Sequence, residues 1–350
     1  MAASGRDDVV AALHRIAFLL ERAQASEYRA AAYRRAGDRL RDLPEGEWRA
    51  RRADGAWTTV PDVGSSTAKV VVDVLAGRTP EVASDLEAGL SGRLAGATTA
   101  GNALRARLRG DLHAHTDASD GATPIQDMAL AALGIGHEYL AITDHSPRLT
   151  VANGLSAPRL RAQMDRIALM NQVLDTGDRP LRLLTGIEVD VLGNGTLDQK
   201  PGLLRELDVV VASVHSRLRS ERSVMTRRMV TAVSDPATDV LGHCTGRRVR
   251  GRTRPPSDFD AAEVFAACAA HGVAVEVNAR PDRRDPPDEI LSVAVDAGCL
   301  FSVDSDAHAP GQLDWLVDGC DRLAAFGVDL DRVVTTWPVE RLLEWTHRHG

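Results

Sequence analysis

The sequence predicts an α/β fold in which a parallel domain of alternating strands and helices follows a smaller all-α domain. Two observations support this prediction. From about Asp111 onward, short apolar runs alternate with segments whose apolar residues have helical spacing, whereas the residues before Asp111 show helical spacing alone. At 350 residues and 44% hydrophobic content, the chain can form a barrel-sized core and a small bundle.

Three N-terminal segments have apolar residues at helical spacing, and prolines separate them. The segments are residues 8–20, 27–40 and 66–75, with Pro44 and Pro61 as breaks. We therefore expect a small helical domain over residues 1–95. An Ala-, Gly- and Arg-rich stretch follows it, and residues 96–110 are expected to form a linker.

Six apolar runs in the second part of the chain are predicted to be buried parallel strands. They are residues 139–143, 182–187, 207–214, 239–242, 273–277 and 299–303. Nearly continuous apolar runs are typical of strands that are covered on both faces. Helical patterns such as Pro158 to Leu174 and Asp260 to His271 lie between them. In a barrel of this kind, which we expect over residues 111–350, the carboxyl ends of the strands meet on one face.

Histidine and carboxylate clusters stand at the ends of these runs. The clusters are residues 111–121, 143–146, 186–190, 212–216, 242–244, 276–278 and 304–308. His113 and His115 are two residues apart, so on a strand they share a face. Imidazole and carboxylate ligands without thiolates suit Zn, Mn or Fe better than Ca or Mg. One such histidine would more often be a core residue, but the repetition predicts the multi-metal centre of a hydrolase. His137 and His271, which precede strands, are expected to be structural.

Seven motifs in a fixed order carry a resemblance to a known family. DLHAHTDASDG, AITDHS, GIEVDVL, VASVHS, LGHCTGR, VEVNARPDR and SDAHAPGQL follow one another between Asp111 and Trp345. This part of the chain resembles the PHP (polymerase and histidinol phosphatase) family. The resemblance implies a distorted seven-stranded (β/α) barrel that binds three divalent metal ions, Zn, Mn or Fe. It also implies nine ligands: His113, His115, Asp120, His145, Glu188, His215, His243, Asp306 and His308.

The resemblance further implies how the ligands are shared among the ions. Glu188 bridges two ions; His113, His115 and Asp306 hold the first, His215 and His243 the second, and Asp120, His145 and His308 the third. Clustered divalent ions lower the pKa of a bound water and neutralise charge on a phosphate, so attack on phosphorus is the expected chemistry. Glu188, Asp306 and His215 are the residues on which we expect catalysis to depend.

Residues beside the ligands offer further roles. Asp144 and Asp190 are candidates for carboxylates that orient ligating imidazoles, although helix capping or surface solvation would explain them equally well. Arg217 and Arg247 are candidates for binding the substrate phosphate. Forty arginines and two lysines occur in the chain, so any one arginine is weakly diagnostic.

Two loops are expected to border the mouth of the barrel. Residues 146–155 form the first. Arg280, Asp282, Arg283 and Arg284 form the second, and within it Arg283 and Arg284 are interpreted as surface charges.

The N-terminal domain carries a second resemblance. Residues 27–40 and 60–75 resemble the lyase-type domain of family X DNA polymerases, where a helix-hairpin-helix turn binds a DNA phosphate through backbone N–H groups. Asp62 replaces the first glycine of the Gly-x-Gly turn, and only Gly64 remains, which argues against phosphate binding. The lyase lysine falls at Val70, and the neighbouring Lys69 would point about 100° away on a helix. We therefore do not expect lyase activity.

Polymerase activity is excluded by length, because no palm domain fits between Thr79 and Gly110.

The net charge of the barrel favours a small substrate. Residues 111–350 carry 25 Lys and Arg against 35 Asp and Glu, in a chain of net charge −7. A barrel this acidic lacks the basic surface of a tight nucleic-acid binder. The favoured function is thus hydrolysis of a small phosphomonoester.

Two alternatives remain open. One is a 3′-5′ exonuclease or 3′-phosphatase acting on DNA in repair, which the polymerase-type N-terminal domain favours. The other is a non-catalytic DNA-repair adaptor, against which the complete ligand set argues, because so many buried polar groups are costly without a function.

The sequence also predicts where the protein is located. Four cysteines without paired spacing, and the lack of any signal-like or membrane-spanning segment, predict a cytoplasmic protein with no membrane partner.

Overall fold

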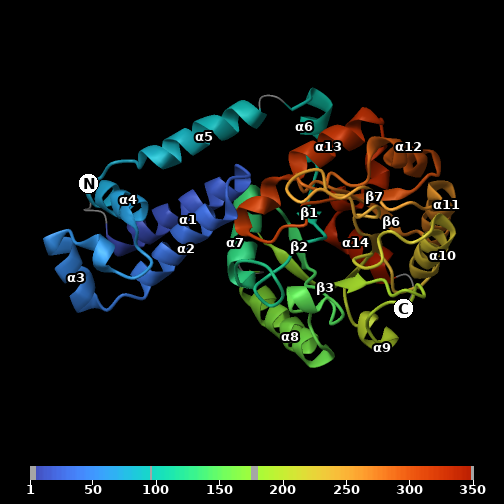
Figure 1. Cartoon of the computed structure of the whole chain (residues 1–350), viewed down its shortest axis with the longest axis horizontal. Helices are drawn as coiled ribbons and strands as arrows, with labels where there is room; N and C mark the ends of the chain where they lie inside the picture. Colours follow the sequence, from blue (N-terminus) through green and yellow to red (C-terminus); the bar gives the residue numbers. More distant parts are fainter. Residues whose placement is uncertain (1–4, 95–96, 175–179, 348–350) are drawn as a thin grey trace. The chain divides into compact units, whose positions relative to one another are not determined.

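A computed structural model describes residues 5–94, 97–174 and 180–347, which fall into two compact units, 1–96 and 97–350 (Figure 1). The first unit is all helical. Its elements are α1 (Arg6–Arg22), α2 (Glu27–Arg41), α3 (Glu45–Asp54), η1 (Trp57–Thr59), α4 (Ser65–Leu75) and α5 (Glu81–Leu94). The three predicted helices are confirmed as α1, α2 and α4, while α3 and α5 were not predicted.

The first unit has its own apolar core. Helices α1 and α2 pack along each other, and Leu13, Ile16 and Leu40 are fully buried in this core. Trp48 of α3 and Trp57 of η1 belong to the same core, and their rings lie 5.0 Å apart. Burial of a large aromatic or aliphatic side chain contributes about 1.5–3 kcal/mol, so this unit is stabilised without the barrel's core.

Asp62 occupies the turn that precedes α4. Its φ of 64° lies in the left-handed region that favours glycine. The carboxylate does not stand alone, since Arg39 lies 3.2 Å and Arg35 3.8 Å from its oxygens. Its negative charge is therefore offset by two arginines on α2.

The second unit is a barrel of seven parallel strands that pair in sequence order. The strands are β1 (Gly110–Asp111), β2 (Tyr139–Ile142), β3 (Arg182–Asp190), β4 (Val209–Ser213), β5 (Val240–Leu241), β6 (Ala274–Asn278) and β7 (Leu300–Asp304). A parallel bridge between Ala114 and Ala307 joins the first strand's extension to that of the last. The sheet is thus nearly closed, and the prediction of a seven-stranded α/β barrel is confirmed.

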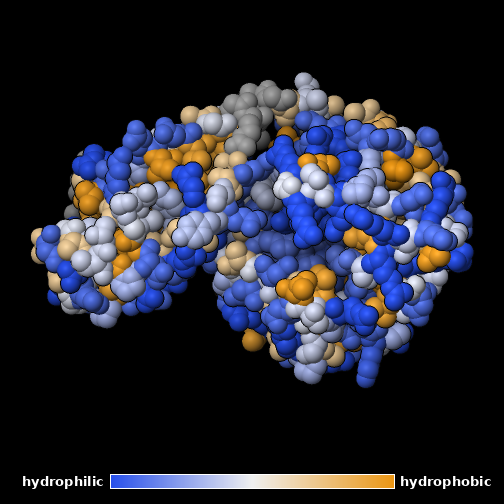
Figure 2. All heavy atoms as spheres, viewed as in Figure 1, coloured by the Kyte–Doolittle hydropathy of each residue, from blue (hydrophilic) through white to orange (hydrophobic). Residues whose placement is uncertain are grey.

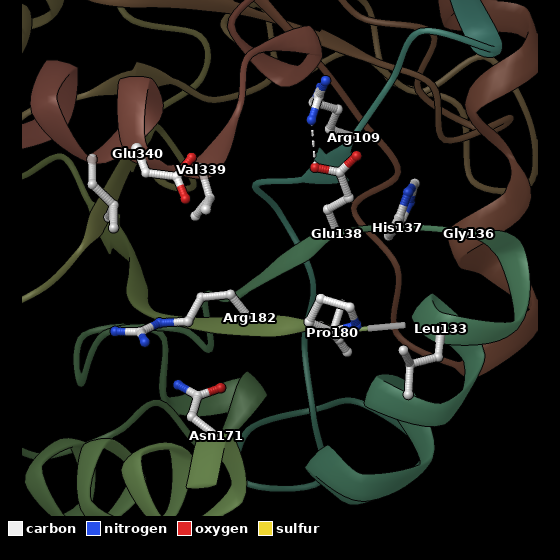
Figure 3. A pocket seen from close by; sticks show the side chains of 12 residues that line it. Arg109, Leu133, Gly136, His137, Glu138, Asn171, Pro180, Arg182, Val339 and Glu340 are labelled. Carbon is white, nitrogen blue, oxygen red and sulfur yellow. Dashed lines mark hydrogen bonds and ion pairs between the residues drawn. The ribbon is translucent and has the colours of Figure 1, made fainter. Parts of the chain in front are cut away.

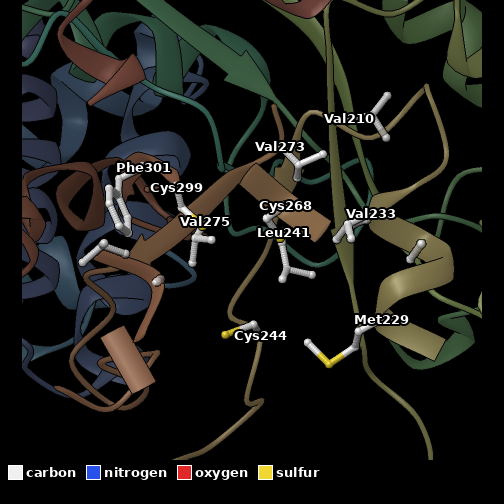
Figure 4. Packing of buried hydrophobic residues seen from close by; sticks show 14 of the residues in the cluster. Val210, Met229, Val233, Leu241, Cys244, Cys268, Val273, Val275, Cys299 and Phe301 are labelled. Atoms are coloured by element: carbon white, nitrogen blue, oxygen red, sulfur yellow. The ribbon is translucent and has the colours of Figure 1, made fainter. Parts of the chain in front are cut away.

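Helices cover the outside of the barrel. They are α7 (Ile125–Ile135), α8 (Ala157–Leu174), α9 (Pro201–Leu204), α10 (Arg222–Val233), α11 (Ala261–His271), α12 (Asp288–Asp296), α13 (Leu316–Ala325) and α14 (Val339–Thr346). Their apolar faces meet the strands in a core where Leu241, Val275 and Phe301 lie near Met229 and Cys268 (Figure 4). The four cysteines are free and buried. No helix in the described ranges is long and apolar enough to cross a membrane.

Most of the expected linker belongs to the barrel unit instead. Helix α6 (Thr99–Arg105) packs against α13, with Thr98 donating to Asp321 at 2.7 Å and Arg105 lying 2.7 Å from Asp314. Gly101 permits this approach, because a Cβ there would meet Asp321 at 1.7 Å. The Thr98 side chain also caps α6, a signal that the composition of the stretch obscured. Residue 96 of the expected linker lies outside the described residues.

Candidate metal centre

The nine predicted ligands converge at the carboxyl end of the barrel. Their donor atoms form four overlapping groups, within each of which all atoms lie within 4.8 Å of one another. The groups are His115, Asp120, His145 and His308; His113, Glu188 and His243; His113, His115 and Asp306; and His145, Glu188 and His215. Each ligand that the resemblance implied is in at least one group.

Glu188 lies at the centre of these groups. Its carboxylate oxygens are 2.7 Å from His145 Nδ1, 2.8 Å from His243 Nε2 and 3.1 Å from His215 Nε2. The side chain is 1% exposed. Burial acts to raise the pKa of this carboxyl group, but the surrounding imidazoles hold it well below its usual range. A carboxylate in this position can bridge two cations.

Ring nitrogens around Glu188 lack hydrogen-bond partners. The buried atoms without a hydrogen bond include His113 Nε2 and both nitrogens of His115. An unsatisfied buried polar atom costs about 1–3 kcal/mol, so hydrogen bonding alone does not account for this cluster. Lone pairs that face a shared space are what divalent ions require, and the residues present therefore fit a multi-metal centre.

Asp120 belongs to the group nearest the solvent. Its Oδ1 lies 3.5 Å from the Nε2 atoms of His145 and His308, and its side chain is 35% exposed. Burial opposes ionisation of Asp120, but hydrogen bonds from the two histidines lower its pKa. This group is the part of the centre that an incoming ligand can reach.

The two predicted orienting carboxylates differ. Asp190 Oδ1 lies 3.3 Å from His215 Nδ1, which is the contact expected of a residue that fixes an imidazole. Asp144 is bonded instead to Thr116 Oγ1 at 2.6 Å and Gln163 Nε2 at 2.6 Å. Asp144 thus holds the loop that leads to Asp120, and no imidazole among the described residues contacts it.

Glu276 on β6 is a functional candidate that the sequence interpretation did not identify. Its Oε1 lies 2.5 Å from His113 Nδ1, and its Oε2 accepts the backbone N–H of His243. Both contacts are fully buried. The only sequence signal was its place in the 276–278 cluster. A strand pattern does not indicate which of the predicted metal ligands a neighbouring carboxylate will contact.

The loop after β6 places two arginines beside Asp306. Arg283 Nε lies 2.8 Å from Asp306 Oδ2, and the Arg283 side chain is 9% exposed. The interpretation of Arg283 as a surface charge was therefore wrong, whereas Arg284 is exposed and pairs with Asp318. Arg280 Nη1 donates to the Asp306 carbonyl oxygen and lies 2.8 Å from His308 Nδ1.

The structure does not bring Arg217 and Arg247 into the site. The Arg247 guanidinium donates to the carbonyl oxygens of Arg283 and Arg284, so its hydrogen-bonding capacity holds the loop after β6. Arg217 is exposed in a left-handed turn, and its guanidinium lies against Gly193. Neither lines the pocket over the metal donors.

That pocket has a volume of about 510 Å³. Three kinds of residue line it: the donors Asp120, His145, His215 and His308; the apolar Leu149, Val151 and Ala152; and the arginines 219, 248, 252, 254, 280 and 283. The apolar residues belong to the loop 146–155 that was expected at the mouth. The arginines come from the loops that follow β4, β5 and β6.

A larger cavity of about 860 Å³ lies at the opposite end of the barrel (Figure 3). Its polar lining includes Arg109, His137, Glu138 and Arg182, and Arg109 pairs with Glu138 at 2.6 Å. Burial lowers the pKa of His137 to about 3, and nearby Arg105 adds to the effect. None of the nine donors reaches this cavity.

Comparison with family models agrees with the site. Residues 111–280 match the PHP domain, and residues 4–79 match a helix-hairpin-helix domain. Residues 111–280 are a PHP domain. Both resemblances that the sequence suggested are therefore confirmed, and all nine donors except Asp306 and His308 lie inside the matched range of the PHP domain.

The chain is similar in sequence to two curated relatives of different kinds. The chain is 38% identical over 213 residues to the DNA polymerase/3′-5′ exonuclease PolX of Bacillus subtilis (strain 168), covering 61% of this chain and 36% of that protein. It is 28% identical over 237 residues to a probable phosphatase of Vibrio parahaemolyticus serotype O3:K6, covering 65% and 88%. The chain thus spans about a third of the first relative and most of the second.

Among solved structures, the PHP domain is similar to the crystal structure of a histidinol phosphate phosphatase from Lactococcus lactis subsp. lactis Il1403, complexed with Zn, L-histidinol and phosphate. The TM-score is 0.44 and the identity 17%, with 63% of this chain and 94% of that chain covered.

Proposed function

We propose that this chain hydrolyses a small phosphomonoester at a centre of three divalent metal ions, Zn, Mn or Fe, in its PHP domain. The broader assignment, a metal-dependent phosphoester hydrolase, is supported by the match to the PHP domain and by similarity to the probable phosphatases. The observation that carries the proposal is the clustering of nine imidazole and carboxylate side chains, four of which line one pocket.

Divalent ions bound here would supply an activated water and neutralise negative charge on the phosphate. The chain's own residues hold the donors in place. The Glu276 carboxylate on His113 Nδ1 keeps the proton on that nitrogen and leaves the Nε2 lone pair facing Glu188. Asp190 acts in the same way on His215, and Arg283 fixes the Asp306 carboxylate.

The pocket itself favours a small substrate over a polymer. A volume of about 510 Å³ lies within the range of roughly 300–1,000 Å³ that is common for small-molecule sites. The net negative charge of residues 111–350 also opposes tight nucleic-acid binding. In addition, four free, buried cysteines fit a reducing compartment such as the cytoplasm.

The alternative is a 3′-5′ exonuclease or 3′-phosphatase on DNA, with DNA bound through the N-terminal domain. The 38% identity to PolX favours it, as does the helix-hairpin-helix match. The pairing of Asp62 with Arg35 and Arg39 also weakens the charge objection to a phosphate at this turn. A non-catalytic repair adaptor is the least supported function, because all nine donors are retained.

One experiment separates these functions. Protein loaded with Mn²⁺ is given a generic phosphomonoester and, in parallel, end-labelled DNA with a recessed 3′ terminus, with the His215→Ala variant as control. We expect release of phosphate from the monoester and loss of this activity in the variant. A ladder of shortened DNA that disappears in the variant would instead support the nuclease. No turnover of either substrate would favour the adaptor.

A further inference from the structure

Six arginines line the pocket over the metal donors, and they form two sets. Arg280 and Arg283 are the inner pair, since they contact Asp306 and His308. Arg219, Arg248, Arg252 and Arg254 are the outer arginines, and none of them has an ion pair with a predicted ligand among the described residues. Figure 2 shows hydrophilic side chains gathered around a hollow in the surface of the barrel.

The charges of the inner pair are already matched. Arg283 lies 2.8 Å from Asp306, and its side chain is 9% exposed. Arg280 lies 3.0 Å from Asp282 and bonds the backbone of Asp306. These two arginines hold the loop after β6 against the metal donors. They therefore leave little positive charge for binding a substrate anion.

The outer arginines are poorly matched. In the part of the chain that the structure describes, no carboxylate pairs with Arg219, Arg252 or Arg254. Arg248 Nε is buried without a hydrogen bond, and Asp282 is 3.8 Å away. Burial lowers the pKa of Arg254, and the neighbouring cations Arg283 and Arg248 lower it further. Like charges this close repel one another unless an anion binds between them.

We propose that the substrate carries a second anionic group, a phosphate or carboxylate, which the outer arginines bind while the phosphomonoester lies at the metal donors. This inference rests on the proposed phosphatase function. One phosphate at the metal ions would be neutralised by the ions. It would leave Arg219, Arg252 and Arg254 without an anionic partner, and Arg248 with only the Asp282 carboxylate at 3.8 Å. The same pocket offers Leu149 and the 92% exposed Val151 to the uncharged part of the molecule.

The test uses three compounds of similar size that differ in anionic groups: glycerol 3-phosphate, 3-phosphoglycerate and 2,3-bisphosphoglycerate. The kcat/KM of the metal-loaded protein is measured for each. Binding is measured by calorimetry on the His215→Ala variant, which prevents turnover. We expect kcat/KM and affinity to rise about tenfold or more from the first compound to the last, because each charge-assisted contact adds binding free energy.

The double variant Arg219→Gln/Arg252→Gln should reduce the ratio of the values for 2,3-bisphosphoglycerate and glycerol 3-phosphate towards one, both in kcat/KM and in affinity. The matched control Arg166→Gln/Arg227→Gln removes two exposed arginines from helices α8 and α10, outside the pocket, and should preserve the ratio. Equal affinity for the three compounds, or the same ratio in both double variants, would overturn the inference.

The binding arm separates this inference from the function on which it rests. Preferential binding of the bisphosphate without turnover of any compound would refute the phosphatase proposal and leave the second-anion site standing. A recessed DNA end could bind more tightly than the bisphosphate and lose affinity in the Arg219/Arg252 variant. That result would refute the inference that the substrate is a small molecule. The outer arginines would then contact successive phosphates of a strand.

Discussion

The two ends of the barrel each hold a cavity lined by arginine, histidine and an acidic residue, yet only one of the cavities contains the predicted metal ligands. The amino-end cavity is the larger, about 860 Å³ against about 510 Å³. Its Arg109 and Glu138 neutralise each other. At the carboxyl end, imidazole nitrogens remain unpaired around a buried carboxylate. His137 Nε2 in the amino-end cavity is unpaired as well, so the clustering of several such atoms around one carboxylate, rather than cavity size, distinguishes the site.

The largest expected effect tests whether chemistry is confined to the carboxyl end. We expect His215→Ala to lower kcat for a phosphomonoester by about 10³-fold or more, because it removes a predicted metal donor, and Asp306→Asn to do the same, because it replaces a charged donor with a neutral amide. Arg182→Ala, in the amino-end cavity, should leave kcat within about twofold. Steady-state kinetics and circular dichroism check both points. A comparable loss in the Arg182 variant would break the comparison.

A smaller effect concerns the carboxylate behind the ligands. Glu276→Gln should weaken metal binding by about 10–100-fold, since a neutral amide no longer favours the Nδ1 proton of His113. Competition with a metal-binding dye measures the affinity directly, without using turnover. Melting of the metal-free variant should stay near that of the metal-free parent protein. An unchanged affinity would mean that Glu276 serves packing alone.

At the amino end, the prediction concerns stability and pH. The pKa of His137 is about 3 in the folded protein against 6.5 for an ordinary histidine, so the native state favours the neutral ring. The contribution of the neutral His137 ring to the free energy of unfolding is present above pH 6.5 and is lost as the pH falls towards 3. Between pH 7 and pH 5 the free energy of unfolding should fall by about 2 kcal/mol more than in His137→Gln. Urea titrations at both pH values measure this difference, and parallel losses would contradict it.

The smallest effect is expected at the rim of the same cavity. Arg109 and Glu138 lie 2.6 Å apart, but their side chains are 40% and 50% exposed. Such pairs contribute about 0–1 kcal/mol, so Arg109→Ala should lower Tm only slightly and leave kcat unchanged. Calorimetry and the phosphomonoester assay test this. A tenfold fall in kcat would show that the amino end takes part in function.

The barrel and its donors could be predicted because both are written in local patterns. Apolar runs mark buried strands, and a polar residue directly after a run must lie at the carboxyl edge, where seven strands of one sheet converge. His145, Glu188 and Asp306 follow predicted runs in this way. His113 instead follows β1, a two-residue strand without an apolar run, which only the family resemblance implied. The structure brings all four residues together as expected.

Residues placed by loops and helix packing were not predictable in the same way. Arg283 enters the interior only because the loop after β6 folds back, with Arg247 bonding its carbonyl oxygen. Helix α6 is fixed by a close approach of Gly101 to α13, a contact between segments far apart in the sequence. No local spacing encodes either contact, so composition suggested a surface charge and a linker.

The bridge between Ala114 and Ala307 has a consequence for the order of synthesis. It brings His113 and His115 beside Asp306, so one donor group joins the first strand's end to the last strand's end. A chain still emerging from the ribosome without Asp306 and His308 has the other seven predicted ligands, but two of the four donor groups each lack a member. The complete donor set therefore forms only after residue 308 has been synthesised.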